Sequence, residues 1–262
     1  MHFLLNLPTP LSFLLVAFVA VATALAGLTV VHRFIPAESL KENQEVAAVI
    51  FSAFGWVYAV VVAFAVFVTW TGYDQAKQNL ELEVSSVLDV FYSASAFREP
   101  LASTIRQAMI KYVSRVEQDE LSHMSSENLV FVSSGPLREL VKIMDRVEES
   151  SLPNRVVYSE SRQKMDDLAR YRRLRIFSGS NTVPPVLWLV LLSGAVVTVV
   201  CTYFFSTPYP WVQHTMTAAL SLMLSLVLFL VFVLDHPFTG RSRLSDAPLE
   251  RALVIMGEHG SR

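Results

Sequence analysis

The sequence of 262 residues is short of charge, since Asp, Glu, Lys and Arg make up 17% of it, whereas a soluble domain carries about 25%. The deficit is local. Residues 1–31, 46–73 and 176–234 contain none of the 44 charged side chains (21 basic and 23 acidic), and residues 74–175 contain 31 of them. This segregation excludes an ordinary soluble globule and indicates a membrane protein with a polar middle region.

Cysteine, metal-ligand patterns and catalytic motifs are also scarce. Cys201 is the single cysteine, so no disulfide forms within the chain, and the six histidines show no repeated ligand spacing. No phosphate-binding loop, nucleophile elbow or zinc-protease motif is present. The acidic pairs at 119–120, 148–149 and 166–167 fit solvated faces. We therefore expect no metal, no other cofactor, no enzymatic activity and no nucleic-acid partner.

The charge-free stretches predict four membrane helices, because about 20 apolar residues cross a hydrocarbon core of about 30 Å. Residues 11–31 and 46–71 each meet this length. The third stretch is long enough for two crossings, and the prolines within 206–210 divide it into spans near 184–206 and 211–234. Ala24-Leu25-Ala26 resembles a signal-peptide cleavage site, but nothing basic precedes the span. We expect the first span to be retained as a membrane helix.

The domain organisation follows from these spans. We expect an all-α membrane protein with an N-terminal transmembrane hairpin (1–73), a helical cytoplasmic domain (74–183), a C-terminal hairpin (184–234) and a tail (235–262). The linker between the first two spans holds only Arg33 and Lys41, and the other 19 basic residues lie in the middle region and the tail. The positive-inside rule places that middle region and both termini in the cytoplasm.

Apolar periodicity predicts helices throughout the middle region. Apolar residues recur every three or four positions from Leu80 to Ala94, with Glu81, Glu83 and Asp89 on other faces, and the next proline is Pro100. The second membrane helix is therefore expected to continue to about residue 97. Further helices are predicted near 101–116, 137–147 and 157–176, the last leading directly into the third span. Loops are predicted at 122–134 and 150–154, and the run 128–133 is either a buried turn or helix start, which we prefer, or a strand.

The spans contain no Asp, Glu, Lys or Arg, which argues against a coupled transporter, because such carriers place a charged group inside the bundle. A passive pore with an apolar constriction remains compatible, but it requires several copies in a ring. The second span carries Gly55, which allows close packing, and one helical stripe. This stripe either packs against helices or lipid, or it lines a pore. Its members are Ala53, Val57, Val60, Phe64, Phe67 and Thr71.

Arginines cluster just before the third span, at positions Arg170, Arg172, Arg173 and Arg175. As a basic membrane-surface patch they anchor the chain at the level of the lipid headgroups. The alternative is that they attract anionic lipids or concentrate anions beside a pore mouth.

A structural motif follows the fourth span and consists of Asp235, Pro237, Phe238 and Gly240. Pro237 ends the helix and Gly240 lets the chain turn. We expect Phe238 to tuck against the cytoplasmic helices and Asp235 to cap or bond a neighbouring backbone amide. His236 is best explained as part of a helix end at the membrane surface. The motif predicts a bend that docks the tail.

Five segments together resemble the bacterial bestrophin-like family, formerly a domain of unknown function, and the resemblance covers essentially the whole chain. They are Gly55–Ala59, Ala63–Phe64, Trp70–Lys77, Glu81–Leu88 and Leu234–Gly240. The resemblance implies a pentamer of four-helix subunits in the bacterial inner membrane. It also implies that the second helices line a central ion path, with Val60, Phe64 and Phe67 near an apolar neck.

The function implied by this resemblance is an oligomeric channel that conducts small ions passively. Its partners are the lipid bilayer, other copies of itself and a permeant ion of open identity. The alternative is a non-conducting scaffold or sensor whose cytoplasmic helices bind a partner. Calcium-responsive bestrophins carry a dense acidic clasp after the last helix, and here only Asp246, Glu250 and Glu258 follow it, spread out. Calcium gating is not expected.

Overall fold

The computed structural model describes residues 8–34, 44–121, 135–145, 155–180, 183–205, 207, 209–239 and 244–260. Within these ranges the regular structure is helical and no strand is present, which confirms the predicted all-α class. The predicted loops at 122–134 and 150–154, with the candidate strand at 128–133, lie outside the described residues. The chain divides into two compact units, unit 1 with Met1–Gly72 and Thr182–His236, and unit 2 with Tyr73–Asn181 and Pro237–Arg262.

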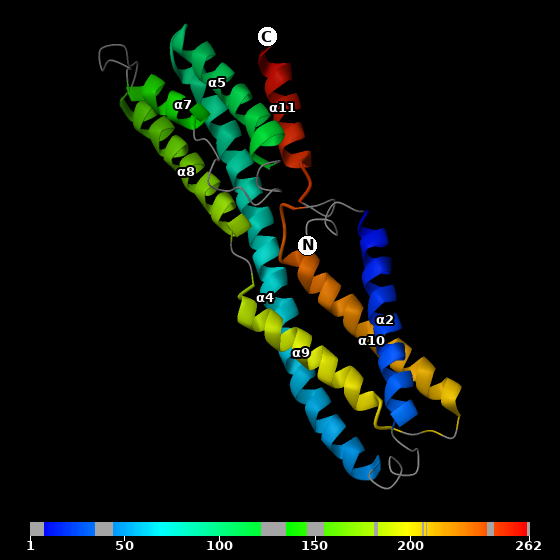
Figure 1. The fold of residues 1–262 in the computed structure, drawn as a ribbon. Helices are drawn as coiled ribbons and strands as arrows, with labels where there is room; N and C mark the ends of the chain where they lie inside the picture. Colours follow the sequence, from blue (N-terminus) through cyan, green and yellow to red (C-terminus); the bar gives the residue numbers. More distant parts are fainter. Residues whose placement is uncertain are drawn as a thin grey trace. The chain divides into compact units, whose positions relative to one another are not determined.

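Unit 1 contains α2 (Thr9–Phe34), the first part of α4 (Gln44–Ser93), α9 (Pro185–Thr202) and α10 (Pro210–Leu234), shown in Figure 1. These four helices are long and apolar enough to cross a membrane. The helix α9 is shorter than the predicted span, because the chain leaves the helix in a turn at Tyr203 and Phe204.

The most extensive helix contact in unit 1 is between α2 and α10, the blue and orange helices of Figure 1. Both helices bury small or polar residues, and the rings of Phe13 and Phe229 also meet between them. Ala17 and Ala24 of α2 are buried, and so are Thr217, Ser221 and Ser225 of α10. In a membrane, small side chains let two helix backbones approach closely, and this close packing drives their association in place of a hydrophobic effect.

The helix α4 is one continuous helix of 50 residues, which makes it about 75 Å long at 1.5 Å per residue. This length exceeds the bilayer core of about 30 Å and confirms that the second membrane helix continues into the polar middle region of the chain. No proline occurs between Gln44 and Ser93, and a short 3₁₀ turn over Ala94–Ala96 ends the run. The same helix thus contributes residues to both units.

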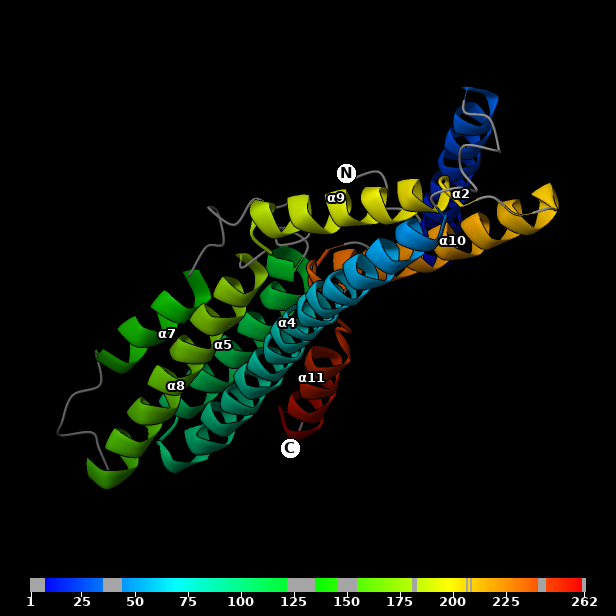
Figure 2. The same cartoon turned by 90° about the horizontal axis from the view of Figure 1, so that it is seen from below.

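Unit 2 packs α5 (Leu101–Arg115), α7 (Gly135–Asp145), α8 (Arg155–Ser180) and α11 (Ala247–Gly260) around the second part of α4 (Figure 2). A short π-helical segment, Val116–Glu120, extends α5. One apolar core joins these helices through buried residues that include Val87, Met109 and Met256.

The predicted direct passage from the 157–176 helix into the third span is wrong. The helix α8 ends at Ser180 and α9 begins at Pro185, with Val183 and Pro184 outside any helix. Pro184 has ψ 137°, because a residue that precedes a proline is disfavoured in the helical region. The chain therefore breaks its helix between α8 and α9.

Candidate functional site

The predicted stripe on α4 is exposed along its whole length in a single chain. Val57, Val60, Phe64 and Phe67 expose 66, 68, 61 and 66% of their surface, respectively. Thr71 is also exposed, and its hydroxyl donates a hydrogen bond to the Phe67 carbonyl oxygen at 2.8 Å. A continuous apolar face of this kind marks contact with a membrane or with further protein.

The opposite face of α4 packs inside unit 1 and sets the rotation of the helix. Ala65 is fully buried in one cluster with Leu191 of α9 and Val231 of α10. The phenol O–H of Tyr58 donates a hydrogen bond to the carbonyl oxygen of Leu191 at 2.8 Å. Turning α4 about its axis would break this bond and expose Ala65. The stripe is therefore held facing away from its own chain.

Glycines on the neighbouring helices allow the close contacts of unit 1. A Cβ atom at Gly194 of α9 would overlap the ring carbons Cε2 and Cδ2 of Tyr58. A Cβ atom at Gly27 of α2 would lie 2.6 Å from the hydroxyl oxygen of Tyr203. The expectation that Gly55 serves close packing is wrong within this chain, because a Cβ atom there would meet nothing within 4 Å.

Exposed residues also follow the unit 2 part of α4, and all of them except Leu82 are polar. They keep the three- and four-residue spacing of the stripe, at Gln75, Gln78, Leu82, Ser85 and Asp89. The side-chain amide of Gln78 donates a hydrogen bond to Asp74 at 2.8 Å. The apolar periodicity of the sequence predicted which residues of this segment are buried. It gave no role to the exposed polar residues, because polar residues on a helix outside the membrane normally face water.

The four clustered arginines do not share one surface. Arg170 and Arg173 are exposed, whereas Arg172 exposes 5% of its surface and Arg175 none. The predicted membrane-surface patch therefore does not hold for Arg172 and Arg175. These two residues are three positions apart, so they share the face of α8 that packs into unit 2.

Glu83, predicted on a polar face of its helix, is the buried partner of Arg175. Arg175 donates from Nε to Oε2 of Glu83 at 2.6 Å and from Nη2 to Oε1 at 3.1 Å. The Tyr112 hydroxyl donates to Oε1 at 2.6 Å. The helices α4, α5 and α8 therefore meet at one carboxylate, whose negative charge is balanced inside unit 2.

Asp235 joins the end of α10 to the start of α9. Its Oδ1 accepts a hydrogen bond from the Val183 backbone N–H at 2.6 Å, and its Oδ2 accepts one from the Trp188 indole N–H at 3.2 Å. The backbone N–H of Asp235 donates a hydrogen bond to the Val231 carbonyl oxygen at 2.9 Å, which joins the residue to the end of α10. Both bonds of this buried carboxylate fix the entry of the chain into α9.

The rest of the Asp235 motif turns the chain into unit 2. Pro237 and Phe238 are buried after the end of α10, and Phe238 belongs to the same apolar core as Leu249 and Met256 of α11. Gly240 lies outside the described residues. The motif thus has a packing role in the part of the chain that the structure describes.

A family model of the bestrophin-like domain matches residues 18–249. The chain belongs to the bestrophin-like family. Among solved structures it is similar to a membrane protein, with TM-score 0.75 and 11% identity over 94% of this chain and 99% of the other. It is also similar to a variant of a bacterial bestrophin homologue from Klebsiella pneumoniae, with TM-score 0.73 and 12% identity over 92% of this chain and 98% of the other. No curated protein sequence matches it.

The sequence interpretation missed a row of buried polar residues in this bestrophin-like chain. Gln213, Thr217, Ser221 and Ser225 recur every four residues on α10 and are all buried. The signal was available, because polar and small residues repeated at helical spacing within an apolar span mark a helix contact. The helix that this row of residues contacts could not be predicted, since the repeat does not say which span it meets.

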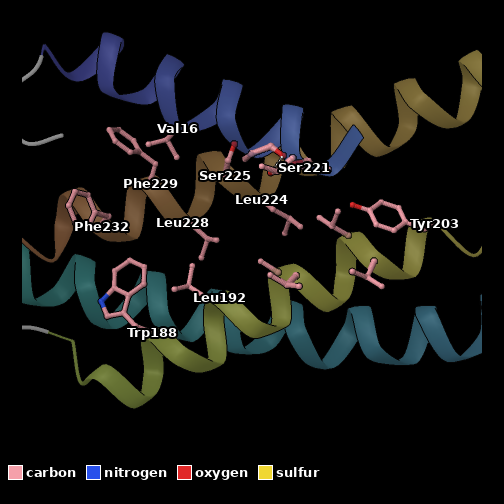
Figure 3. Close-up of a pocket in the computed structure, with 17 residues that line it drawn as sticks. Val16, Trp188, Leu192, Tyr203, Ser221, Leu224, Ser225, Leu228, Phe229 and Phe232 are labelled. Carbon is pink, nitrogen blue, oxygen red and sulfur yellow. Dashed lines mark hydrogen bonds between the residues drawn. The ribbon is translucent and has the colours of Figure 1, made fainter. Parts of the chain in front are cut away.

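The described part of the bestrophin-like chain offers no metal site, because no three His, Cys, Asp or Glu side chains lie together there. What it offers are two apolar features of unit 1. One is the stripe on α4. The other is a cavity of about 490 Å³ between α2, α9 and α10, shown in Figure 3.

Proposed function

We propose that this chain is one subunit of an oligomeric ion channel and that the stripe on α4 lines a central pore. The observation that carries the proposal is the exposure of Val57, Val60, Phe64 and Phe67 while Ala65 on the opposite face is fully buried. Each subunit thus presents a continuous apolar wall that its own helices leave uncovered. Several copies arranged around an axis would join these walls into one passage.

The chemistry of the stripe supports passive conduction. Its unit 1 part is apolar and carries no charged side chain. An ion that crosses it therefore meets no ionisable group that could couple its movement to a proton or to a second ion. A ring of phenylalanines at Phe64 or Phe67 forms a constriction that gates by excluding water. The polar residues farther along α4, from Gln75 to Asp89, would rehydrate the ion beyond the constriction.

Family membership supports the same proposal, since the bestrophin-like family consists of ion channels. We place the protein in the bacterial inner membrane as a pentamer, with unit 2 and both termini in the cytoplasm. The orientation rests on basic residues, of which only Arg33 and Lys41 lie in the linker of the first two spans. The bilayer and other copies of the chain are then its partners.

Purified protein in liposomes tests the proposal. Sodium and chloride fluxes above those of empty vesicles, together with a pentamer by mass, are the expected result. Vesicles no leakier than protein-free ones, combined with a monomer or dimer by mass, would refute the channel and favour a non-conducting scaffold or sensor.

A further inference from the structure

The cavity between α2, α9 and α10 is an elongated slot. Figure 3 shows Trp188 at one end and Tyr203 at the other, with Leu192, Leu224 and Leu228 between them. Trp188 and Tyr203 are 15 positions apart, which corresponds to about 22 Å along a helix. The volume of about 490 Å³ lies within the range of about 300–1,000 Å³ that is usual for ligand sites.

The slot exists because small residues line it where large ones would fill it. Three alanines and two serines contribute, namely Ala20, Ala24, Ala195, Ser221 and Ser225. These residues come from all three helices, so the space is a property of the packed unit and not of one kinked helix. A larger residue at any of these positions would project into the slot.

The lining selects an apolar ligand. None of its residues is charged, and two of its hydroxyl groups bond within their own helices. The Thr23 hydroxyl donates to the Val19 carbonyl oxygen at 2.8 Å, and the Ser225 hydroxyl donates to the Leu222 carbonyl oxygen at 2.8 Å. A charged ligand would lose its hydration here without gaining an ionic partner.

The slot is continuous with the outer surface of the membrane helices. Leu192 and Val196 line it and yet expose 51 and 61% of their surface. In a bilayer that surface contacts the hydrocarbon of the lipids, so the slot opens sideways onto acyl chains. The two aromatic ends are held in place, Trp188 by its bond to Asp235 and Tyr203 by its contact with Gly27.

We propose that this slot binds a lipid acyl chain that enters from the surrounding bilayer. The long, narrow, uncharged lining matches one extended hydrocarbon chain. Its lateral opening admits that chain while the headgroup stays at the membrane surface. This proposal is independent of the proposed channel function, because it concerns a different face of unit 1.

Photocrosslinking tests the site in the full chain, reconstituted in vesicles of phosphatidylethanolamine and phosphatidylglycerol. The photoreactive residue p-benzoylphenylalanine replaces Leu192 in the slot or, as the matched control, Leu189, which is on the same helix, is 70% exposed and does not line the slot. Intact mass after irradiation identifies the adduct. We expect lipid adducts at both positions.

Filling the slot separates specific occupancy from general lipid contact. Ala195→Phe, and independently Ala20→Leu from the opposite wall, should lower the lipid adduct at position 192 several-fold and leave that at position 189 unchanged. Two folded variants from different helices guard against misfolding of either one. Adducts at position 192 that neither variant lowers would overturn the proposal. A crosslink from position 192 to a second copy of the chain would overturn it too.

Discussion

Arg175 and Glu83 form an ion pair inside unit 2, with Nε of Arg175 2.6 Å from Oε2 of Glu83 and side chains that are 0 and 1% exposed. They are 92 positions apart in the sequence. Because α4 supplies Glu83 and also carries the exposed stripe, this pair ties the position of that helix to α8.

Replacing Glu83 by Gln should destabilise the protein by about 3–5 kcal/mol, because it leaves the charge of Arg175 buried without its counter-charge. Thermal unfolding of the purified protein in detergent measures this loss. Glu139→Gln is the matched control, since Glu139 pairs with Lys111 at 3.5 Å on an exposed surface, and its unfolding should be unchanged. A similar shift in both variants would contradict a special role for the buried pair.

Replacing both partners should be far less harmful than replacing one. The double variant Glu83→Leu/Arg175→Met removes both charges together, so no unpaired charge is left in the core. Its midpoint of unfolding should lie closer to that of the original protein than the midpoint of Glu83→Gln. A double variant that is less stable than the single one would show that the pair is needed for more than charge balance.

Phe64→Ala should increase ion flux several-fold without loss of assembly if Phe64 forms the constriction, because alanine widens an apolar neck. Phe18→Ala is the control, since Phe18 of α2 is 74% exposed and lies off the stripe. Liposome flux and oligomer mass are measured for both. Equal changes in flux at the two positions would contradict the neck assignment.

Gly194→Ala should disrupt unit 1, because its Cβ atom would overlap the Tyr58 ring, and overpacking of this kind costs about 1–3 kcal/mol. Gly55→Ala, on the packing partner α4, meets nothing within 4 Å and should leave stability unchanged or raise it by about 1 kcal/mol through helix propensity. Thermal unfolding midpoints of the two variants, compared with that of the original protein, measure these effects. Equal midpoints would show that α9 shifts to make room.

Asp235→Ala should destabilise the junction between α10 and α9 by about 1–3 kcal/mol, because it leaves the buried Val183 N–H without an acceptor. Hydrogen exchange at Val183 should accelerate correspondingly. Glu81→Ala, at an exposed position of α4, serves as the control and should leave that exchange unchanged. Unaltered exchange at Val183 in Asp235→Ala would mean that another group protects it.

Much of the fold was determined by the sequence alone. Long runs without charge specify membrane helices, because a buried charge in hydrocarbon is costly whatever the neighbours are. The continuation of α4 to Ser93 followed from the same kind of local rule, since no proline interrupts it and apolar residues such as Leu80 and Phe91 keep helical spacing.

Pairings between distant segments were decided only by the tertiary structure. Periodicity says that Glu83 and Arg175 lie on particular faces of their helices, but not that those faces meet, and a charged residue on a helix outside the membrane is normally solvated. The contact of Tyr58 with Gly194 and the slot between α2, α9 and α10 likewise depend on which helices are neighbours. Local sequence determines what each helix exposes, whereas packing in three dimensions determines what covers it, because side chains remote in the sequence share the contact.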